Sequence, residues 1–352
     1  MGNNVAFRTL ERQGGAFYRR RDMAAKPFPI LFITASRIGD AVLTSGLVKA
    51  LAREIPAARF TIVGSALTAP LFAQTPGLER LIVMEKQPLG AHWLGLWRQV
   101  RARRWGLVVD LRGSGLSGLL NRSRRAVHGM SPLGGHKVVE AARLLKLERD
   151  PPAPYLFTSP EIEARATALT QGAGPILAIA PSANWIGKTW PSERFAAVAR
   201  RLLGPGGAMA GGRLMVLGAY RDRLDADPVK AAVPSGRQID LVGAEDLLVC
   251  HAALKRARLF IGNDSGLMHL AAAAGVPTLG LFGPSDETAY APWGLQARAF
   301  RGPRTFAEFK EIDPHLNQAV CHMMDLRTEV VVSAAETLLR ETGPVAPADA
   351  HA

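Results

Sequence analysis

The chain has 352 residues, 48% of them hydrophobic, which is enough for two domains with cores of ordinary size. No apolar run reaches the length of about 18 residues that a membrane span needs, and the N-terminus lacks the apolar segment of a cleaved signal peptide. The two cysteines lie too far apart in sequence to suggest a zinc site or a disulfide framework, so we expect the protein to reside in a reducing cytoplasm. The net charge of +13 favours an anionic partner, but no RNA-binding signature or zinc finger accompanies it and nucleic acid is not expected.

Much of the positive charge lies before residue 150. It falls in an arm over residues 1–27, which is predicted to be disordered, and in three later clusters at 98–104, 122–125 and 137–149. A solvated face is the simpler explanation for each cluster taken alone.

Strands and helices alternate in the first half of the chain. The apolar pattern predicts strands over 29–34, 59–64, 81–84 and 107–111, and helices over 40–54, 93–103, 138–145 and 161–171. Such alternation is typical of a parallel sheet wrapped by helices. Prolines at 151–154 and the sequence GAGP at 172–175 enclose the linker, so we expect one domain over 28–170 and a second over 171–342.

The same pattern restarts in the second half, with strands over 176–180, 213–218, 259–261 and 276–282, and helices over 192–203, 247–256, 267–274 and 329–340. We expect the last helix to pack back on the first domain and residues 343–352 to form a disordered tail. The prediction is therefore an α/β fold of two doubly wound, Rossmann-like domains that face a central cleft. In such sheets ligands bind beyond the carboxyl ends of the strands.

Asp40 lies at the start of the helix that follows the first strand. Gly39 before it permits close approach, and a carboxylate at a cleft edge is able to accept a proton from a hydroxyl. The alternative is a plain helix cap, the commonest use of aspartate at this place.

Trp93, Leu96, Trp97 and Val100 recur at helical spacing, with arginines between and after them. This stripe indicates a helix face that packs on the sheet. A membrane-facing amphipathic helix is the alternative, and in either case the arginines are able to point at lipid phosphates.

Residues 182–189 nearly match a phosphate-binding loop of the form GxxxxGK[ST], with Lys188 in the lysine position. Ser182 replaces the first glycine, and Pro191 follows where the helix of a true loop would already run. We therefore predict that Lys188 is a fixed cation over a diphosphate, without a metal ion. A solvated lysine is the alternative.

Asp222 comes just after the strand over 213–218, where an acid is able to bind ribose hydroxyls, although a surface aspartate fits equally well.

The run RLFIGNDSGLMHLAAAAGVPTLGLFGPS at 258–285 predicts a strand, a tight loop, a short helix and a second strand. Amide groups at the helix start suit a phosphate, and Asp264 beside them suits sugar hydroxyls. This is the layout of a nucleotide-sugar site, and an ordinary capped turn is the alternative. His269 fits a buried supporting position better than a catalytic one.

Together these segments resemble the bacterial heptosyltransferases, which use ADP-heptose to build the inner core of lipopolysaccharide. The matching segments are RIGDAVLTSGLVKAL at 37–51, PSANWIGKTWPSERF at 181–195 and GNDSGLMHLAAAAGVPTLGLFGPS at 262–285, in the family's order and spacing. The resemblance implies the GT-B architecture and an inverting mechanism that needs no metal or other cofactor.

Carried over by position, the resemblance makes Asp40 the catalytic base and Lys188 the diphosphate-binding lysine. Asn184 stands where a hydroxyl-bearing phosphate contact is usual, and Asp222 where the family more often has glutamate for the ribose. Asp264 matches the sugar-contacting acid. The other implied donor contacts are Ser265 and Gly266 for the phosphates, and Gly243, Glu245, Met268 and His269 for the sugar or nucleotide.

The expected activity is transfer of a sugar, by resemblance heptose from ADP-heptose, to an anionic glycolipid at the inner face of the cytoplasmic membrane, where the enzyme is peripherally associated. Candidate contacts to the acceptor or to lipid phosphate are Arg37, Arg98, Arg101 and Arg112. The alternatives are a sugar-nucleotide epimerase or hydrolase, a nucleotide triphosphatase with a phosphate-binding loop, and a non-catalytic nucleotide- or lipid-binding module.

Overall fold

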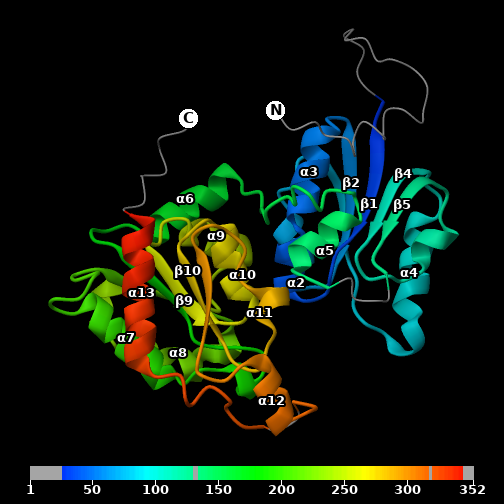
Figure 1. The fold of residues 1–352 in the computed structure, drawn as a ribbon. Coiled ribbons are helices and arrows are strands. Elements are labelled where there is room, and N and C mark those ends of the chain that lie inside the picture. The colour runs from blue at the N-terminus through cyan, green and yellow to red at the C-terminus, as the bar shows by residue number, and fades with distance from the viewer. Residues whose placement is uncertain (1–25, 130–133, 317–318, 344–352) are drawn as a thin grey trace. The chain divides into compact units, whose positions relative to one another are not determined.

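The structure is a computed structural model that describes residues 26–129, 134–316 and 319–343. The predicted basic arm and the predicted tail lie almost wholly outside the described residues. The chain divides into two compact units between Phe157 and Thr158, so the boundary precedes the expected one at 170/171 (Figure 1).

The first unit holds a parallel sheet of five strands in the order β3-β2-β1-β4-β5. This is a doubly wound order, in which the direction of winding reverses between β1 and β4. Its strands are β1 (Phe28–Ile33), β2 (Ala58–Gly64), β3 (Leu78–Val83), β4 (Trp105–Asp110) and β5 (Arg122–Val127), and its helices are α2 (Ile38–Thr44), α3 (Gly46–Glu54), α4 (Ala91–Val100) and α5 (Lys137–Arg143).

Two features of this unit differ from the prediction. The helix expected over 40–54 is two helices, because the chain turns at Ser45, and Gly46 begins α3 in a place with no room for a side chain. Strand β5 was not predicted. Its sequence RSRRAV reads as a charged surface segment, and the structure uses it as a charged edge strand, which discourages pairing with other chains.

The second unit holds a parallel sheet of six strands in the order β11-β10-β9-β6-β7-β8, with the reversal between β6 and β9. The strands are β6 (Ile176–Ala180), β7 (Arg213–Gly218), β8 (Gln238–Val242), β9 (Leu259–Asn263), β10 (Thr278–Phe282) and β11 (Ala297–Arg301). The helices are α6 (Pro160–Leu169), α7 (Ser192–Leu203), α8 (Arg223–Lys230), α9 (Leu247–Leu254), α10 (Gly266–Ala273), α11 (Glu287–Tyr290), α12 (Phe306–Ile312) and α13 (Thr328–Thr342).

Helices cover both faces of the second sheet. Buried residues of α7, α8 and α13 form one core with the strands, while α10 packs on β9 and β10 and joins α9 and α6 (Figure 1). Helix α13 therefore packs within its own unit, which corrects the expectation that it returns to the first domain. The prediction of two doubly wound parallel sheets is confirmed.

Candidate active site

Two loops meet where the winding of the second sheet reverses, at the carboxyl ends of β6 and β9. Asn263, the last residue of β9, is fully buried and ties the loops together: its side-chain oxygen accepts from the Trp190 amide at 3.0 Å, and its nitrogen donates to the carbonyl of Pro181. Doubly wound sheets bind their ligands at this reversal point.

Lys188 and Asp264 are brought together at this point, as the sequence predicts. The Lys188 Nζ donates to Asp264 Oδ2 at 3.0 Å, and the two side chains are only 18% and 8% exposed. Their mutual neutralisation allows both charges to be held so far from water. His269 lies behind them, 3% exposed, with its Nε2 4.0 Å from the second oxygen of Asp264, which is the supporting position expected for it.

The loop that carries Lys188 is fastened from behind by residues 321–326. The Cys321 thiol donates to the carbonyl of Thr189 at 3.1 Å, the His322 amide to that of Gly187 at 3.1 Å, and the indole of Trp190 to that of Leu326 at 2.9 Å. These three bonds fix the position of the lysine.

Lys188 does not belong to a phosphate-binding loop of the triphosphatase type. It ends a short 3₁₀ turn, η4 (Ile186–Lys188), and the chain then extends through Thr189 to Pro191 before α7 begins at Ser192. The Thr189 hydroxyl donates to the carbonyl of Trp185 at 2.9 Å. Both features argue against the alternative of a nucleotide triphosphatase, in which lysine and threonine open the helix.

Three serine hydroxyls follow three neighbouring strands at this edge: Ser182 after β6, Ser265 after β9 and Ser285 after β10. Each Oγ is buried without a hydrogen-bond partner among the described residues. Buried polar atoms are nearly always paired, so these three hydroxyls are available to bond to oxygen atoms of a ligand at this edge. Sequence reasoning selected Ser265 alone; the position of the other two after strands was the available signal.

Ser265 also begins α10, where it occupies the N-cap position without bonding to the helix. The free amides of the first turn and the free hydroxyl therefore face the same end of the helix, which is the end that favours an anion.

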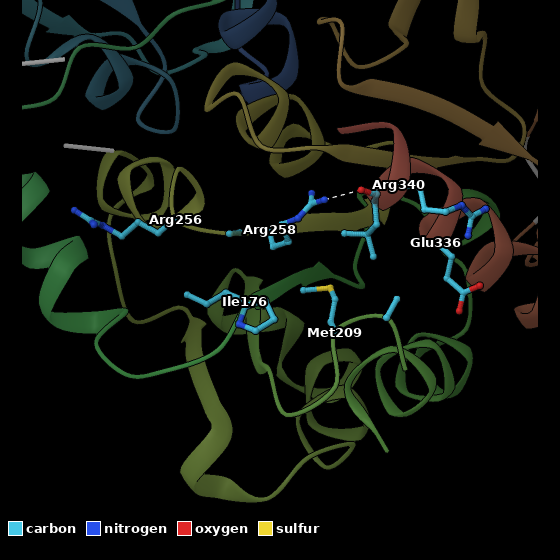
Figure 2. A pocket seen from close by; sticks show the side chains of 10 residues that line it. Ile176, Met209, Arg256, Arg258, Glu336 and Arg340 are labelled. Atoms are coloured by element: carbon cyan, nitrogen blue, oxygen red, sulfur yellow. Dashed lines mark hydrogen bonds between the residues drawn. The ribbon is translucent and has the colours of Figure 1, made fainter. Parts of the chain in front are cut away.

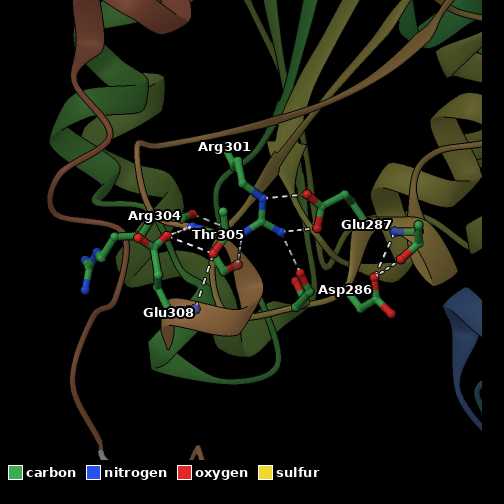
Figure 3. Close-up of polar contacts among 9 residues, drawn as sticks. Asp286, Glu287, Arg301, Arg304, Thr305 and Glu308 are labelled. Atoms are coloured by element: carbon green, nitrogen blue, oxygen red, sulfur yellow. Dashed lines mark hydrogen bonds and ion pairs between the residues drawn. The ribbon is translucent and has the colours of Figure 1, made fainter. Parts of the chain in front are cut away.

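The loop after β10 is held by Arg301 (Figure 3). Its guanidinium donates to the carbonyls of Gly283 at 3.1 Å and Ser285 at 2.8 Å and pairs with Glu287. Arg304, three residues beyond β11, pairs with Asp325 at 2.6 Å, so the loops at this edge are linked to one another.

Asp222 and Glu245 already have partners. One oxygen of Asp222 accepts from the Ala219 amide at 2.7 Å, as the alternative of a structural aspartate requires, and Glu245 pairs with Arg165 of α6. Gly243 is needed for close approach: it adopts φ +65°, and a Cβ there would lie 2.7 Å from the Cα of Tyr220.

Two further candidates lie differently from expectation. Met268 is fully buried, with its sulfur on β10 at Gly280, so its side chain belongs to the core, and only its backbone amide, in the first turn of α10, is placed for a donor contact. Asn184 is exposed in the bend before η4, four residues from Lys188.

In the first unit, Asp40 is the third residue of α2, and Arg37 occupies the N-cap position. The Asp40 side chain is half-buried. The alternative of a plain N-cap is therefore wrong: the carboxylate belongs to the first turn, beyond the carboxyl end of β1.

Arg112 follows β4, the neighbour of β1, and is half-buried. Its guanidinium lies 5.3 Å from the centre of the Trp93 ring, and one of its terminal nitrogens is buried without a hydrogen-bond partner in the described part of the chain. Burial lowers the pKa of this guanidinium, against an opposing effect of Asp110. Arg112 is thus prepared for an anion, whereas Arg98 and Arg101 lie exposed on and just after α4.

Sequence reasoning missed a polar cluster beyond β5. Glu140 is 2% exposed and contacts His128 Nε2 at 2.9 Å and Lys137 Nζ at 2.6 Å. Burial alone would raise the pKa of the Glu140 carboxyl, but the bonds to Lys137 and His128 hold it below its usual value. Since these residues lie far apart in sequence from Asp40, only the fold reveals that they occupy the same sheet edge.

A cavity of about 630 Å³ opens at the opposite edge of the second sheet, at the amino ends of β6 and β9 (Figure 2). Arg256, Arg258 and Arg340 line it, and Arg258 donates to the carbonyl of Leu339 at 2.6 Å. Ligands of doubly wound sheets bind at the other edge, so we do not assign the donor to this cavity.

Within the described residues, no group of three or more histidine, cysteine, aspartate and glutamate side chains is arranged to hold a metal ion. No helix in the same part of the chain is both long enough and apolar enough to cross a bilayer.

Comparison with known proteins finds a matching family and relatives that cover most of the chain. Residues 134–317 match the family model of "Glycosyltransferase family 9 (heptosyltransferase)". The chain is 24% identical to lipopolysaccharide heptosyltransferase 2 of Salmonella typhimurium, over 89% of this chain and 99% of the relative, and 25% identical to the Escherichia coli enzyme of that name, over 77% and 87%.

Solved structures agree on the fold. E. coli ADP-heptose lps heptosyltransferase II superposes with a TM-score of 0.70 at 20% identity, covering 90% of this chain and 99% of the other. A family 9 glycosyltransferase from Veillonella parvula gives 0.74 at 22% identity, covering 91% and 100%. The expected GT-B fold class is confirmed.

Proposed function

Because this chain belongs to glycosyltransferase family 9, the heptosyltransferases, we propose that it transfers heptose from ADP-heptose to an anionic glycolipid acceptor of lipopolysaccharide core synthesis, with inversion and without a metal ion. The observation that carries the proposal is the paired Lys188 and Asp264 beside the three unpaired serine hydroxyls. A cation, a carboxylate and free hydroxyls suit a diphosphate joined to a sugar.

In this mechanism the bond between the anomeric carbon and the diphosphate oxygen breaks, and its electron pair goes to the leaving phosphate. Lys188, the Ser265 hydroxyl and the amide of Gly266 stabilise the growing negative charge. Asp264 exchanges its contact with Lys188 for hydroxyls of the sugar.

An acceptor hydroxyl attacks the anomeric carbon from the opposite face, and Asp40 takes its proton, which inverts the configuration. Arg112, with its buried unpaired nitrogen, binds a negative group of the acceptor, and Arg37 lies on the neighbouring loop. Such an acceptor would hold the enzyme peripherally at the inner face of the cytoplasmic membrane.

The test is transfer of heptose from ADP-heptose to a deacylated core acceptor, with the product configuration determined by NMR. Asp40→Asn should lower kcat by about three orders of magnitude while the donor Kd stays unchanged. Asp150→Asn, an exposed aspartate of the same unit, is the control. Loss of donor binding together with activity in Asp40→Asn would contradict the assignment of Asp40 as base.

Transfer should continue undiminished in EDTA, because Lys188 and the helix amides replace a metal ion. A thermal-shift panel of ADP-, UDP-, GDP- and CDP-sugars identifies the donor, since a tight ligand raises Tm by mass action. Triphosphate hydrolysis that requires Mg²⁺ would favour the triphosphatase instead.

A further inference from the structure

Several apolar side chains on and around helix α4 of the first unit are exposed to solvent. Leu89, in the 3₁₀ turn η2 (Pro88–Gly90) that leads into α4, is fully exposed, Leu94 on α4 is 49% exposed, and Leu119, at the end of the turn η3 (Leu116–Leu119), is 73% exposed. Trp97 links α4 to η3, because its indole lies 3.5 Å from the carbonyl of Leu119. We call this set, with Arg98 and Arg101, the α4 surface.

Leu89 is held in a conformation that leucine rarely adopts. Its φ is +53° and its ψ +17°, in the left-handed region where only glycine, asparagine and aspartate are common. The fully exposed side chain buries no apolar surface that would offset the strain, so the strain points to a function of that side chain.

Cations accompany these side chains. Residues 91–104 contain four arginines and no acidic residue. Arg103 pairs with Glu79, but Arg98, Arg101 and Arg104 form no ion pair with any acidic group that the structure describes, and Arg101 stacks on Trp97 with 4.8 Å between guanidinium and ring centre.

The two kinds of side chain share one side of the helix. Leu94, Arg98 and Arg101 follow one another at intervals of four and three residues. Trp97 is partly buried beside them against the core, and Leu96 and Val100 turn into the core. The predicted stripe of Trp93, Leu96, Trp97 and Val100 therefore faces the core, whereas Leu94, Arg98 and Arg101 lie outside it and are exposed.

We propose that the α4 surface docks on an anionic lipid bilayer, with Leu89, Leu94 and Leu119 entering the headgroup boundary and Arg98 and Arg101 contacting lipid phosphates. Leucine and tryptophan next to unpaired arginines are the composition of an interfacial segment, and the arginines are complementary in charge to such a membrane and to no neutral one. The inference rests on the proposed function, because a lipid-linked acceptor requires the enzyme at the bilayer.

The experiment is co-sedimentation of the full chain with vesicles of phosphatidylcholine containing 30% phosphatidylglycerol. We expect binding that weakens as salt is raised and that is lost with phosphatidylcholine alone. Leu89→Asp should reduce partitioning by about tenfold, and the double variant Arg98→Gln with Arg101→Gln by roughly fivefold for each arginine.

Matched controls come from the second unit. Leu295 is 95% exposed, and Arg200 and Arg201 form an exposed pair in the last turn of α7. Leu295→Asp and the double variant Arg200→Gln with Arg201→Gln should bind vesicles like the unchanged protein. Equal losses in these controls would overturn the proposal, since charge and hydrophobicity anywhere on the surface would then suffice.

Leu89→Gly separates docking from folding. Glycine adopts the left-handed conformation without strain, so Tm should stay level or rise while vesicle binding falls. A lower Tm with unchanged binding would show that Leu89 serves the fold and would overturn the proposal.

Measuring transfer to the deacylated acceptor separates the proposal of heptose transfer from the proposal of membrane docking. Leu89→Asp and Leu89→Gly should retain that activity, because transfer to a deacylated acceptor needs no lipid. An unchanged protein that transfers heptose yet binds no vesicles would refute the docking surface alone, whereas one that binds vesicles and transfers nothing would refute the proposed function.

Discussion

Some contacts of single side chains in the second unit are predictable from sequence, and others are not. Lys188 and Asp264 are 76 residues apart, yet each follows a strand next to the reversal of its sheet, so the rule for doubly wound folds predicted their meeting. Asp222 was chosen by the same rule and Glu245 by the family resemblance, and the two side chains are bound to Ala219 and Arg165. Which acid has a local partner depends on side-chain geometry that no strand pattern encodes.

Lys188→Gln tests the cation in the donor site. Loss of a charge-assisted bond to the diphosphate should cost about 2 kcal/mol, or roughly thirtyfold in the donor Kd measured by calorimetry. The control is Lys230→Gln, which removes a lysine of similar burial that pairs with Asp227 and Asp240. Equal weakening in both variants would contradict a specific role for Lys188.

Two helical glycines, Gly46 and Gly95, test how the space around a glycine affects the stability of the fold. Gly46 begins α3, and a Cβ there would lie 2.3 Å from the carbonyl oxygen of Pro152, whereas Gly95 within α4 has open space. Gly46→Ala should lower the free energy of unfolding by about 1–3 kcal/mol. Gly95→Ala should raise it by about 0.5–1 kcal/mol, because alanine is the better helix former.

At the scale of elements, the segment 321–326 holds the Lys188 loop in position through hydrogen bonds. Trp190→Phe removes the indole bond to Leu326, and Trp105→Phe, its control, removes an equivalent buried bond to Val100 in the first unit. Denaturant unfolding should show that the free energy of unfolding of each variant is lower by about 1–3 kcal/mol. Only Trp190→Phe should also weaken donor binding, by about tenfold, because the lysine is displaced. Unchanged donor affinity would show that the loop needs no fastening.

Elements with clear apolar periodicity were predictable: β6, α7 and β7 have the bounds expected from sequence. Strands β5 and β11 lie at sheet edges and carry arginines, so their sequences lack the apolar run that identifies a buried strand. Where α2 and α3 are divided, Gly46 lies against the backbone of Pro152 and Ala153, over a hundred residues away in sequence.

At the scale of the whole molecule, part of the positive charge serves the fold. Arg213, Arg237 and Arg258 lie at the amino ends of strands and donate to the carbonyls of Thr170, Leu203 and Leu339, near the ends of α6, α7 and α13. Helix C-termini carry partial negative charge, so each arginine is neutralised locally. The net charge therefore overstates the attraction for an anionic partner, and the unpaired arginines matter more.

Stability should depend on pH through His251. Burial lowers its pKa to about 4, whereas the unfolded chain titrates near 6.5. Between these values only the unfolded state binds the proton, so the free energy of unfolding should fall by up to about 3 kcal/mol as pH drops from 6.5 to 4. Denaturant unfolding across this range measures the slope. His251→Asn, which keeps a donor toward Leu270, should flatten it, and an unchanged slope would assign the effect to other groups.

The internal pairing of Lys188 has a consequence for turnover. Asp264 lies 3.0 Å from Lys188, and under the proposed mechanism this carboxylate replaces a departing diphosphate as the counter-ion of the lysine. Under the proposed mechanism, an intact donor engages Asp264 with its sugar and suppresses this competition, while the spent nucleotide does not. The enzyme would then release the nucleoside diphosphate without first binding another ligand. Asp264→Asn would bind the nucleoside diphosphate more tightly than the unchanged protein does.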